Sequence, residues 1–233
     1  MKSVPQPQSV TKRRFFAPAL ATAVVSFAFA ETGSAANILL NPGFELGTGS
    51  DATDWTEFDS PPAGSTMRSS LSPNSGGFHM YMQVDNLNNP PQGVALFAEQ
   101  NQGANTVDNT LNYNLSFFAK TDTTDFTGVN IFYQILWLDQ DGSDGGGVKG
   151  ETLTSLLGEG INTSYQQFGV TDQDIPDGAD SFLLRFQLSA GAIPDIVQGA
   201  YFDDVVLEIV PEPASLSLLA LGGLVLFGRR RRA

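Results

Sequence analysis

The stretch LNYNLSFFA, residues 111–119, decides the fold class because apolar and polar side chains alternate along most of its length. A period of two places successive side chains on opposite sides of an extended chain, as in a half-buried β-strand. One side would carry Leu111, Tyr113, Leu115, Phe117 and Ala119. The stretch therefore predicts a strand with one face in a core.

The stretch VNIFYQILWL, residues 129–138, differs because both of its faces are largely apolar or aromatic. Such a strand is expected in the middle of a sandwich. Residues 139–147, DQDGSDGGG, follow it and supply the glycine and aspartate that tight turns need. This segment fails the EF-hand calcium pattern, because Gly142 comes too early and Gly150 stands where a bidentate glutamate is needed. A hairpin turn is the better interpretation.

Short apolar or alternating runs recur at intervals of roughly a dozen residues across residues 37–209, separated by turn-forming residues, which predicts an all-β sandwich or barrel. No long stretch repeats apolar residues at helical spacing, although residues 152–157 could form a helical turn. The expected strands are 38–40, 55–58, 78–84, 94–100, 112–120, 129–138, 148–156, 165–170, 181–188 and 200–209.

The start of the chain has the composition of a targeting segment. Basic residues at 12–14 precede an apolar run over residues 15–30, which predicts a secretory signal peptide with a short signal helix. Cleavage would follow Ala30 or Ala36, since small residues precede both positions. We favour Ala36, so the predicted signal peptide is residues 1–36.

Residues 37–209 form the predicted domain, which is long enough for one core of its own. It holds 23 acidic residues and four basic ones, so its net charge is about −19. The basic residues are Arg68, Lys120, Lys149 and Arg185. Because phosphate binding needs a concentrated positive patch, this composition argues against nucleic acid or an anionic membrane as a partner. Cations, neutral glycans and basic proteins stay open as partners.

The last segment, residues 210–233, holds a proline-flanked turn, an uncharged run over residues 214–228 and a terminal arginine cluster. As a helix the run would span about 22 Å, which is shorter than a stable transmembrane helix of roughly 20 residues. Arginines behind it would stay on the cytoplasmic side. The turn and cluster residues are Pro211, Glu212, Pro213, Arg229, Arg230, Arg231 and Arg232.

This order of turn, apolar helix and arginines resembles the PEP-CTERM sorting tail of bacterial envelope and secreted proteins. The resemblance implies that an exosortase, a membrane protease-transpeptidase, processes the tail, so that membrane contact is transient. It also implies delivery to the cell surface or the extracellular matrix. An ordinary tail anchor is the alternative.

The inventory of reactive residues is short. There is no cysteine, so an exported domain of this size must be held by its core, with or without a bound metal ion. His79 is the only histidine, and a multi-histidine zinc site and a cysteine nucleophile are therefore excluded. Paired carboxylates could hydrolyse glycosides, but 23 acidic residues always offer some pair. His79 could act as a base, although a packing role is the stronger interpretation. We therefore expect no enzyme.

The two ends of the domain carry a second resemblance. Its opening and closing segments resemble those of carbohydrate-binding modules with a galactose-binding-like jelly roll, and three inner segments follow in the same order. The matching segments are NPGFE at 41–45, DWT at 54–56, SGGF at 75–78, YNLSFFAK at 113–120, FLLRF at 182–186 and GAYFDDVVL at 199–207. The resemblance covers nearly all of residues 37–209 and implies a β-sandwich jelly roll that binds glycans.

A metal site is expected where the first and last strands pair. Pairing would bring Glu45 close to Asp203 and Asp204, and converging carboxylates repel one another unless a hard cation lies among them. Alternation would also place Asp203 on one face with Tyr201 and Val205, buried without a partner. The resembling modules hold a structural Ca²⁺ here, which implies Ca²⁺ at Glu45, Asp203 and Asp204. Solvated carboxylates at a sandwich edge are the alternative.

A sugar site requires aromatic faces that stack on pyranose rings, flanked by hydrogen-bonding groups. The candidates are Trp55, Tyr81, Tyr133, Gln134 and Trp137. Each could instead be a packing residue, because Trp137 lies in the most apolar strand and the resembling modules often keep a packing tryptophan at the place of Trp55. The sequence thus predicts an exported surface or matrix protein whose sandwich binds glycans without catalysis. A structural matrix or adhesion protein without a specific ligand is the alternative.

Overall fold

The computed structural model describes residues 35–103, 105–139 and 147–210. The predicted signal helix, the short C-terminal apolar helix and most of the glycine-rich turn after residue 139 lie outside these ranges. Within them, no helix is long and apolar enough to cross a membrane.

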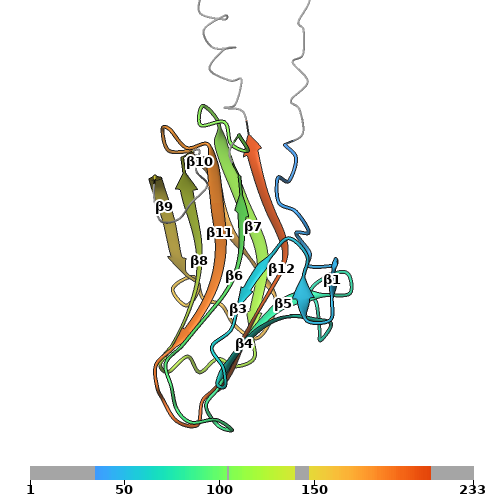
Figure 1. Ribbon diagram of the computed structural model, residues 1–233, viewed down its shortest axis with the longest axis vertical. Coiled ribbons are helices and arrows are strands. Elements are labelled where there is room, and N and C mark those ends of the chain that lie inside the picture. Colours follow the sequence, from blue (N-terminus) through green and yellow to red (C-terminus); the bar gives the residue numbers. More distant parts are fainter. Residues whose placement is uncertain (1–34, 104, 140–146, 211–233) are drawn as a thin grey trace, which may run out of the picture. The chain divides into compact units, whose positions relative to one another are not determined.

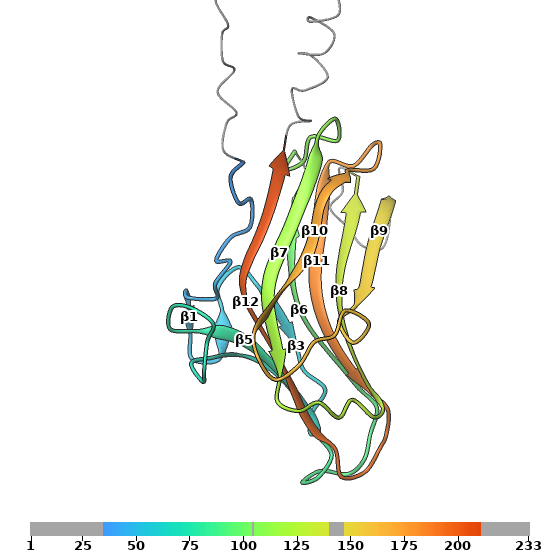
Figure 2. The ribbon, with the colours of Figure 1, turned by 180° about the vertical axis from the view of Figure 1, so that it is seen from behind.

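Two five-stranded antiparallel sheets pack face to face, which confirms the predicted all-β sandwich (Figures 1 and 2). One sheet has the order β10-β7-β12-β5-β4, the other has the order β3-β6-β11-β8-β9, and β1 and β2 form a small separate hairpin. The strands are β1 Gly47–Thr48, β2 Asp51–Ala52, β3 Thr56–Phe58, β4 Gly64–Ser69, β5 His79–Asp85, β6 Val94–Gln102, β7 Asn112–Thr121, β8 Val129–Leu138, β9 Val148–Ser155, β10 Gln166–Asp174, β11 Ser181–Ala190 and β12 Val197–Val210.

The alternating stretch forms β7, and its predicted inner residues from Tyr113 to Ala119 are buried. Phe117 lies where the two sheets meet, with its ring centroid 5.2 Å from Tyr133 of β8 and 4.9 Å from Phe186 of β11. The core is therefore built from the inner faces of both sheets, as the period of two predicts.

The strand with two apolar faces, β8, has β11 on one side and β9 on the other. Its inner residues join the main core, whereas Leu136 and Leu138 pack with Leu183 in a second, smaller apolar cluster. The outer apolar residues of β8 are thus explained by a local cluster at one end of the sheet.

Two expectations about the elements were wrong. Residues 38–40 form no strand, because the backbone pairs with β12 only at an isolated bridge between Asn37 and Glu208, and the side chain of Asn37 supplies further hydrogen bonds to β12. Strand β4 was missed, since its sequence GSTMRS has little β-propensity and pairing with β5 supplies its order. The expected strand over residues 148–156 is confirmed as β9, and residues 152–155 belong to this strand and not to the alternative helical turn.

Strand β12 contains an irregularity that the sequence pattern did not predict. Its register with β7 shifts between Asp203 and Val206, and Asp204 has a φ of 50°. This β-bulge reverses the alternation, so Asp203 pairs with the outward-facing Phe118 while Val205 enters the core. The predicted common face of Asp203 and Val205 is therefore wrong.

Candidate functional site

The structure brings Glu45, Asp203 and Asp204 to the turn formed by residues 74–78. We call this turn and the three carboxylates together the acidic turn. Asp203 is fully buried, and its Oδ2 accepts hydrogen bonds from the backbone N–H groups of Asn74 (2.8 Å) and Ser75 (3.2 Å). Its Oδ1 accepts a third from the N–H of Asp204 (2.8 Å). A buried carboxylate is tolerated here because three donors satisfy it.

The other two carboxylates hold the rest of the acidic turn. Asp204 accepts hydrogen bonds from Asn74 Nδ2 (2.7 Å) and Ser75 Oγ (2.6 Å). Glu45 Oε1 accepts hydrogen bonds from the N–H groups of Gly77 (2.9 Å) and Phe78 (3.2 Å). A Cβ on the neighbouring Gly76 would lie 2.0 Å from Glu45 Oε1, so only glycine permits this approach. The acidic turn therefore ties the beginning of the domain to its last strand.

The carboxylates of the acidic turn are used as hydrogen-bond acceptors. Burial raises the pKa of Asp203 to about 6, and the neighbouring charge of Asp204 acts in the same direction, against the N–H donors. Within residues 35–103, 105–139 and 147–210, no three acidic, histidine or cysteine side chains are grouped as a metal site. Calcium at Glu45, Asp203 and Asp204 stays a prediction, because a cation would need oxygens that already accept hydrogen bonds.

Three of the five predicted sugar-binding residues belong to the core, namely Trp55, Tyr133 and Trp137. Trp55 is 7% exposed, packs 4.9 Å from Phe44 and donates its Nε1–H to Asn41 O (3.1 Å). Trp137 is 1% exposed and packs 4.8 Å from Tyr113. Neither indole face is open at the sheet surface, so the packing interpretation holds for both and their assignment as stacking residues is corrected.

Tyr81 lies on the outer face of the sheet that contains β5. Its hydroxyl donates to Asp122 Oδ2 (2.8 Å), and the hydroxyl of Tyr201 donates to the same carboxylate. Gly199 makes room for this arrangement, because a Cβ there would lie 2.5 Å from Tyr81 Oη. Burial raises the pKa of Tyr81 and the hydrogen bond to Asp122 raises it further, so the hydroxyl stays a neutral donor.

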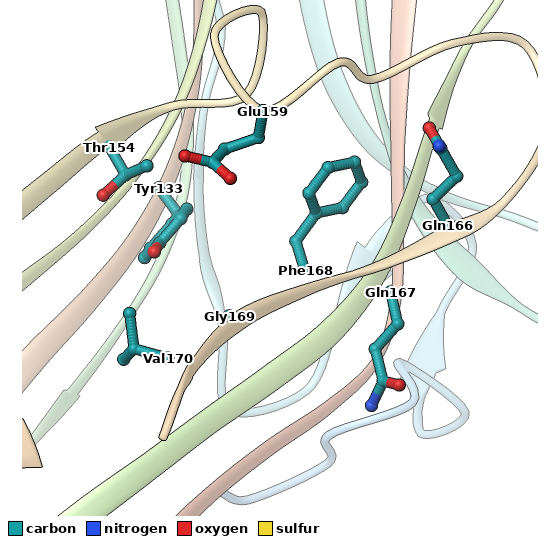
Figure 3. Close-up of a pocket in the computed structure, with 8 residues that line it drawn as sticks. All are labelled: Tyr133, Thr154, Glu159, Gln166, Gln167, Phe168, Gly169 and Val170. Atoms are coloured by element: carbon teal, nitrogen blue, oxygen red, sulfur yellow. The ribbon is translucent and has the colours of Figure 1, made fainter. Parts of the chain in front are cut away.

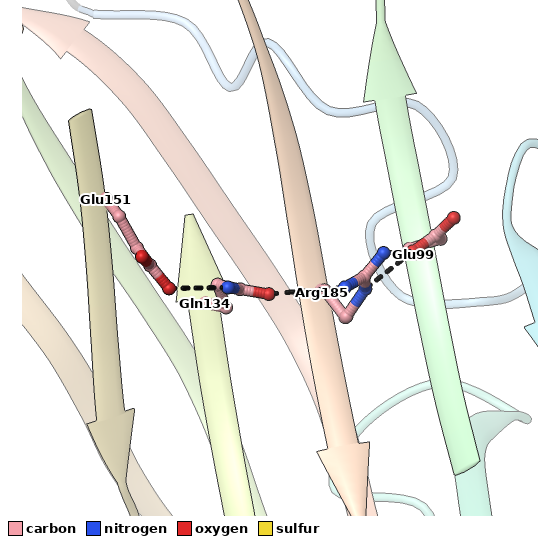
Figure 4. Close-up of polar contacts among 4 residues, drawn as sticks. All are labelled: Glu99, Gln134, Glu151 and Arg185. Atoms are coloured by element: carbon pink, nitrogen blue, oxygen red, sulfur yellow. Dashed lines mark hydrogen bonds and ion pairs between the residues drawn. The ribbon is translucent and has the colours of Figure 1, made fainter. Parts of the chain in front are cut away.

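Gln134 lies on the outer face of the other sheet, in a line of four polar side chains from four adjacent strands (Figure 4). We call this line the polar row; its members are Glu99 of β6, Arg185 of β11, Gln134 of β8 and Glu151 of β9. The Nε–H of Arg185 donates to Glu99 Oε2 (2.6 Å) and its Nη1 to Gln134 Oε1 (3.4 Å). Gln134 Nε2 donates in turn to Glu151 Oε1 (2.6 Å).

Phenylalanine rings flank the polar row on the same outer face. Phe58 of β3 pairs in register with Phe97 of β6, and their ring centroids are 5.2 Å apart. Phe132 of β8 pairs with Gln187 of β11, which itself pairs with Phe97. Phe58 is 41% exposed, and Arg185 lies over the ring of Phe97 at 5.0 Å. This face therefore combines apolar rings with hydrogen-bonding groups.

Sequence reasoning missed most of this face. Phe97 and Glu99 are two residues apart on β6, as are Phe132 and Gln134 on β8. The period of two could therefore have placed the members of each pair on one face. It could not show that these faces point outwards, because both faces of β8 are apolar. Tyr133, the remaining candidate, points inwards from β8 and is 2% exposed.

Comparisons with solved structures show a shared fold. The chain is 16% identical to the Stig cyclase Fisc from Fischerella sp. TAU, with a TM-score of 0.52 over 77% of this chain and 100% of that one. It is 19% identical to an arabinose-bound GH51 α-L-arabinofuranosidase, with a TM-score of 0.46, covering 77% of this chain and 27% of the enzyme. At 16% identity, the similarity to the cyclase concerns the β-sandwich alone.

Carbohydrate-binding modules are also similar to the described sandwich. For the C-terminal family 22 module of Clostridium thermocellum Xyn10B, the identity is 14% and the TM-score 0.43, over 72% of this chain and 92% of that one. No curated protein sequence matches the chain.

Residues 210–232 match the PEP-CTERM protein-sorting motif, which implies an exported, surface-associated protein that an exosortase processes. The chain therefore carries a PEP-CTERM sorting motif at its C-terminus.

Proposed function

We propose that this protein is an exported surface or matrix protein that binds a glycan, without catalysis, on the outer face of the β3-β6-β11-β8-β9 sheet. Residues 1–36 would be the signal peptide, residues 37–209 the binding domain, and residues 210–233 the sorting tail that the exosortase removes. The sandwich would hold the protein to polysaccharide after the tail is processed.

The observation that carries this proposal is the polar row beside half-buried phenylalanine rings. Sugar hydroxyls need donors and acceptors together, and the row offers the amide of Gln134 between the Arg185 guanidinium and the Glu151 carboxylate. Rings such as Phe132 can pack on the apolar face of a pyranose. The half-buried, outward-facing position of Gln134 is the part of the predicted sugar site that supports this assignment.

Charge supports a neutral glycan over an acidic one. The four basic side chains of the domain already have partners within it. Arg68 donates to Phe44 O (2.6 Å), and Lys120 lies 4.5 Å from the ring centre of Tyr201. Lys149 forms an ion pair with Asp139 (3.8 Å), and Arg185 forms one with Glu99. A domain with net charge of about −19 would repel a polyanion over the range of a Debye length, about 8 Å at physiological salt.

A binding role also suits the carboxylates of the row. Glu99 forms an ion pair with Arg185 at 2.6 Å, and Glu151 accepts a hydrogen bond from Gln134. Carboxylates held in this way orient hydroxyls, whereas glycoside hydrolysis needs one of them as a proton donor.

The test is a glycan array probed with residues 37–209 and with Gln134→Ala, each checked for folding by circular dichroism. We expect binding to neutral polysaccharides that falls about tenfold in the variant, since one lost hydrogen bond in a desolvated contact has this order of effect. Gln83→Ala, on the outer face of the opposite sheet, is the matched control and should bind as the wild type does. A blank array for the folded wild type, together with retained assembly into the matrix, would favour the structural alternative.

A further inference from the structure

A second polar feature lies at the lateral edge of the sandwich, where β9 of one sheet and β10 of the other are the end strands. A cavity of about 320 Å³ opens there. Its lining is Tyr133, Thr154, Glu159, Gln166, Gln167, Phe168, Gly169 and Val170 (Figure 3). We call it the edge pocket. Its size is at the lower end of the range for small-molecule sites, which is about 300–1,000 Å³.

The edge pocket places polar groups on the inner side of the sheets, where the core would otherwise continue. Tyr133 and Thr154 are register partners on β8 and β9, and both face inwards. Figure 3 shows the Glu159 carboxylate on the side of the cavity where Thr154 and Tyr133 lie, with the ring of Phe168 on its other side. Two hydroxyls, a carboxylate and an aromatic ring thus share one small cavity.

One group in the lining is incompletely satisfied. Gln166 Oε1 is buried and, among the described residues, has no hydrogen-bond partner. A buried carbonyl oxygen without a partner costs free energy. A ligand hydroxyl that entered the edge pocket beyond Phe168 would satisfy this oxygen.

The wall of the edge pocket is fixed before any ligand binds. The ring of Phe168 stacks on the core residue Phe117 at 6.0 Å. Gly169 has a φ of 143°, and a Cβ there would lie 1.9 Å from Leu115 O, so glycine lets β10 approach β7 closely at this point. The loop that carries Glu159 is closed by a hydrogen bond from Ile161 N to Leu156 O (3.1 Å). Preorganisation of this kind reduces the entropic cost of binding.

The chemistry of the edge pocket defines its ligand. None of the eight lining residues is basic, and Glu159 would repel an anion. Burial raises the pKa of Tyr133, so its hydroxyl is neutral and can donate. We propose that the edge pocket binds one uncharged sugar residue, with hydroxyls on Tyr133, Thr154 and Glu159 and an apolar ring face on Phe168. This proposal rests on the glycan-binding function and adds a second, separate subsite to it.

The experiment is saturation-transfer NMR on residues 37–209 with D-glucose, D-galactose, D-mannose and D-glucuronate as probes. We expect transfer to at least one neutral hexose and none to glucuronate. Glu159→Gln and Thr154→Val should each weaken binding of that hexose about tenfold, because the first replaces a charged acceptor by a neutral amide and the second removes one hydrogen bond to a hydroxyl. Glu159 is exposed, so its variant tests the site without disturbing the core.

Two controls separate this proposal from the function on which it rests. Gln83→Ala, on β5 and outside the lining of the edge pocket, should leave hexose binding unchanged. Gln134→Ala should weaken polysaccharide binding and leave hexose binding intact. Hexose binding that survives Glu159→Gln and Thr154→Val, or the absence of transfer to every neutral hexose, would overturn the edge pocket. If polysaccharide binding still depends on Gln134, the proposed function of the outer sheet face is supported whether or not the edge pocket binds a hexose.

Discussion

The acidic turn and the polar row both contain carboxylates, but the carboxylates have different hydrogen-bond partners and different surroundings in the two regions. In the acidic turn, Asp203 is fully buried and accepts only from backbone N–H groups, so its position is fixed by the fold and in turn fixes the fold. In the polar row, Glu99 and Glu151 accept from side chains on an open sheet face. Asp203 has a structural role because the backbone donates to it. We propose that Glu99 and Glu151, which accept hydrogen bonds from side chains, can also accept them from a ligand.

The largest effect on the free energy of unfolding is expected for Asp203→Ala. The substitution leaves the N–H groups of Asn74, Ser75 and Asp204 without their acceptor, which should lower the free energy of unfolding by about 3 kcal/mol. Urea unfolding followed by tryptophan fluorescence measures this. Asp177→Ala, at an exposed position, is the matched control and should change stability by less than about 0.5 kcal/mol. Equal stabilities of the two variants would contradict a structural role for the acidic turn.

Metal removal tests the acidic turn next. If the predicted Ca²⁺ binds Glu45, Asp203 and Asp204, mass action gives about 2.7 kcal/mol of stabilisation at a hundredfold excess over Kd. We expect EDTA to lower the melting temperature and added Ca²⁺ to restore it, with both effects lost in Glu45→Ala. Magnesium chloride at the same ionic strength is the control for general screening. A melting curve that EDTA leaves unchanged would refute calcium and leave hydrogen bonds as the support of the turn.

Glu57 is a partly buried carboxylate that accepts one backbone hydrogen bond, so it is intermediate between Asp203 and the carboxylates of the polar row. Its effect on stability should depend on pH. Glu57 faces the interior from β3, and its Oε1 accepts a hydrogen bond from Ala52 N (2.8 Å). Burial raises the pKa of Glu57 to about 7, in spite of that bond. A raised pKa means that the folded state binds the proton more tightly, so this contribution to stability is complete below about pH 4.5 and is lost as the pH rises through 7.

Unfolding of the wild type and of Glu57→Gln should therefore be compared at pH 4.5, 6 and 8. We expect the stability of the variant relative to the wild type to increase from pH 4.5 to pH 8. The difference between the two proteins is used because Asp203, with a pKa raised to about 6, contributes the same trend to both. A difference that does not vary with pH would show that Glu57 titrates in the folded state as it does in the unfolded chain.

The smallest effect on stability is expected in the polar row itself. Gln134→Ala should change the free energy of unfolding by less than about 0.5 kcal/mol, since its partners Arg185 and Glu151 can turn to solvent or to other groups. Urea unfolding checks this value beside the array measurement. A loss close to that of Asp203→Ala would place the row among the structural groups and remove the basis of the comparison.

Much of the fold could be predicted because strand pairing obeys a simple period. The alternation in residues 111–119 predicted β7 and its buried face. The irregular parts could not be predicted in this way. Strand β4 has few residues with β-propensity, and the bulge at Asp204 reverses a pattern that otherwise continues along β12.

The candidate site was harder to predict than the fold. Trp55 and Trp137 were candidates because indole rings suit sugars, yet the same size makes them efficient core residues. Gln134 was identified on its own, whereas Glu99, Arg185 and Glu151 come from three other strands and are separated from it along the chain. Their grouping depends on which strands become neighbours, and a local pattern carries no information about that.

By itself the sequence determined the all-β class, the acidic domain without disulfides and the sorting motif at residues 210–232, since each depends on composition or local order. Only the tertiary structure decided which face of β8 is open and where Asp203 points. A period of two states which residues share a face, but the packing of one sheet on the other decides which face is buried.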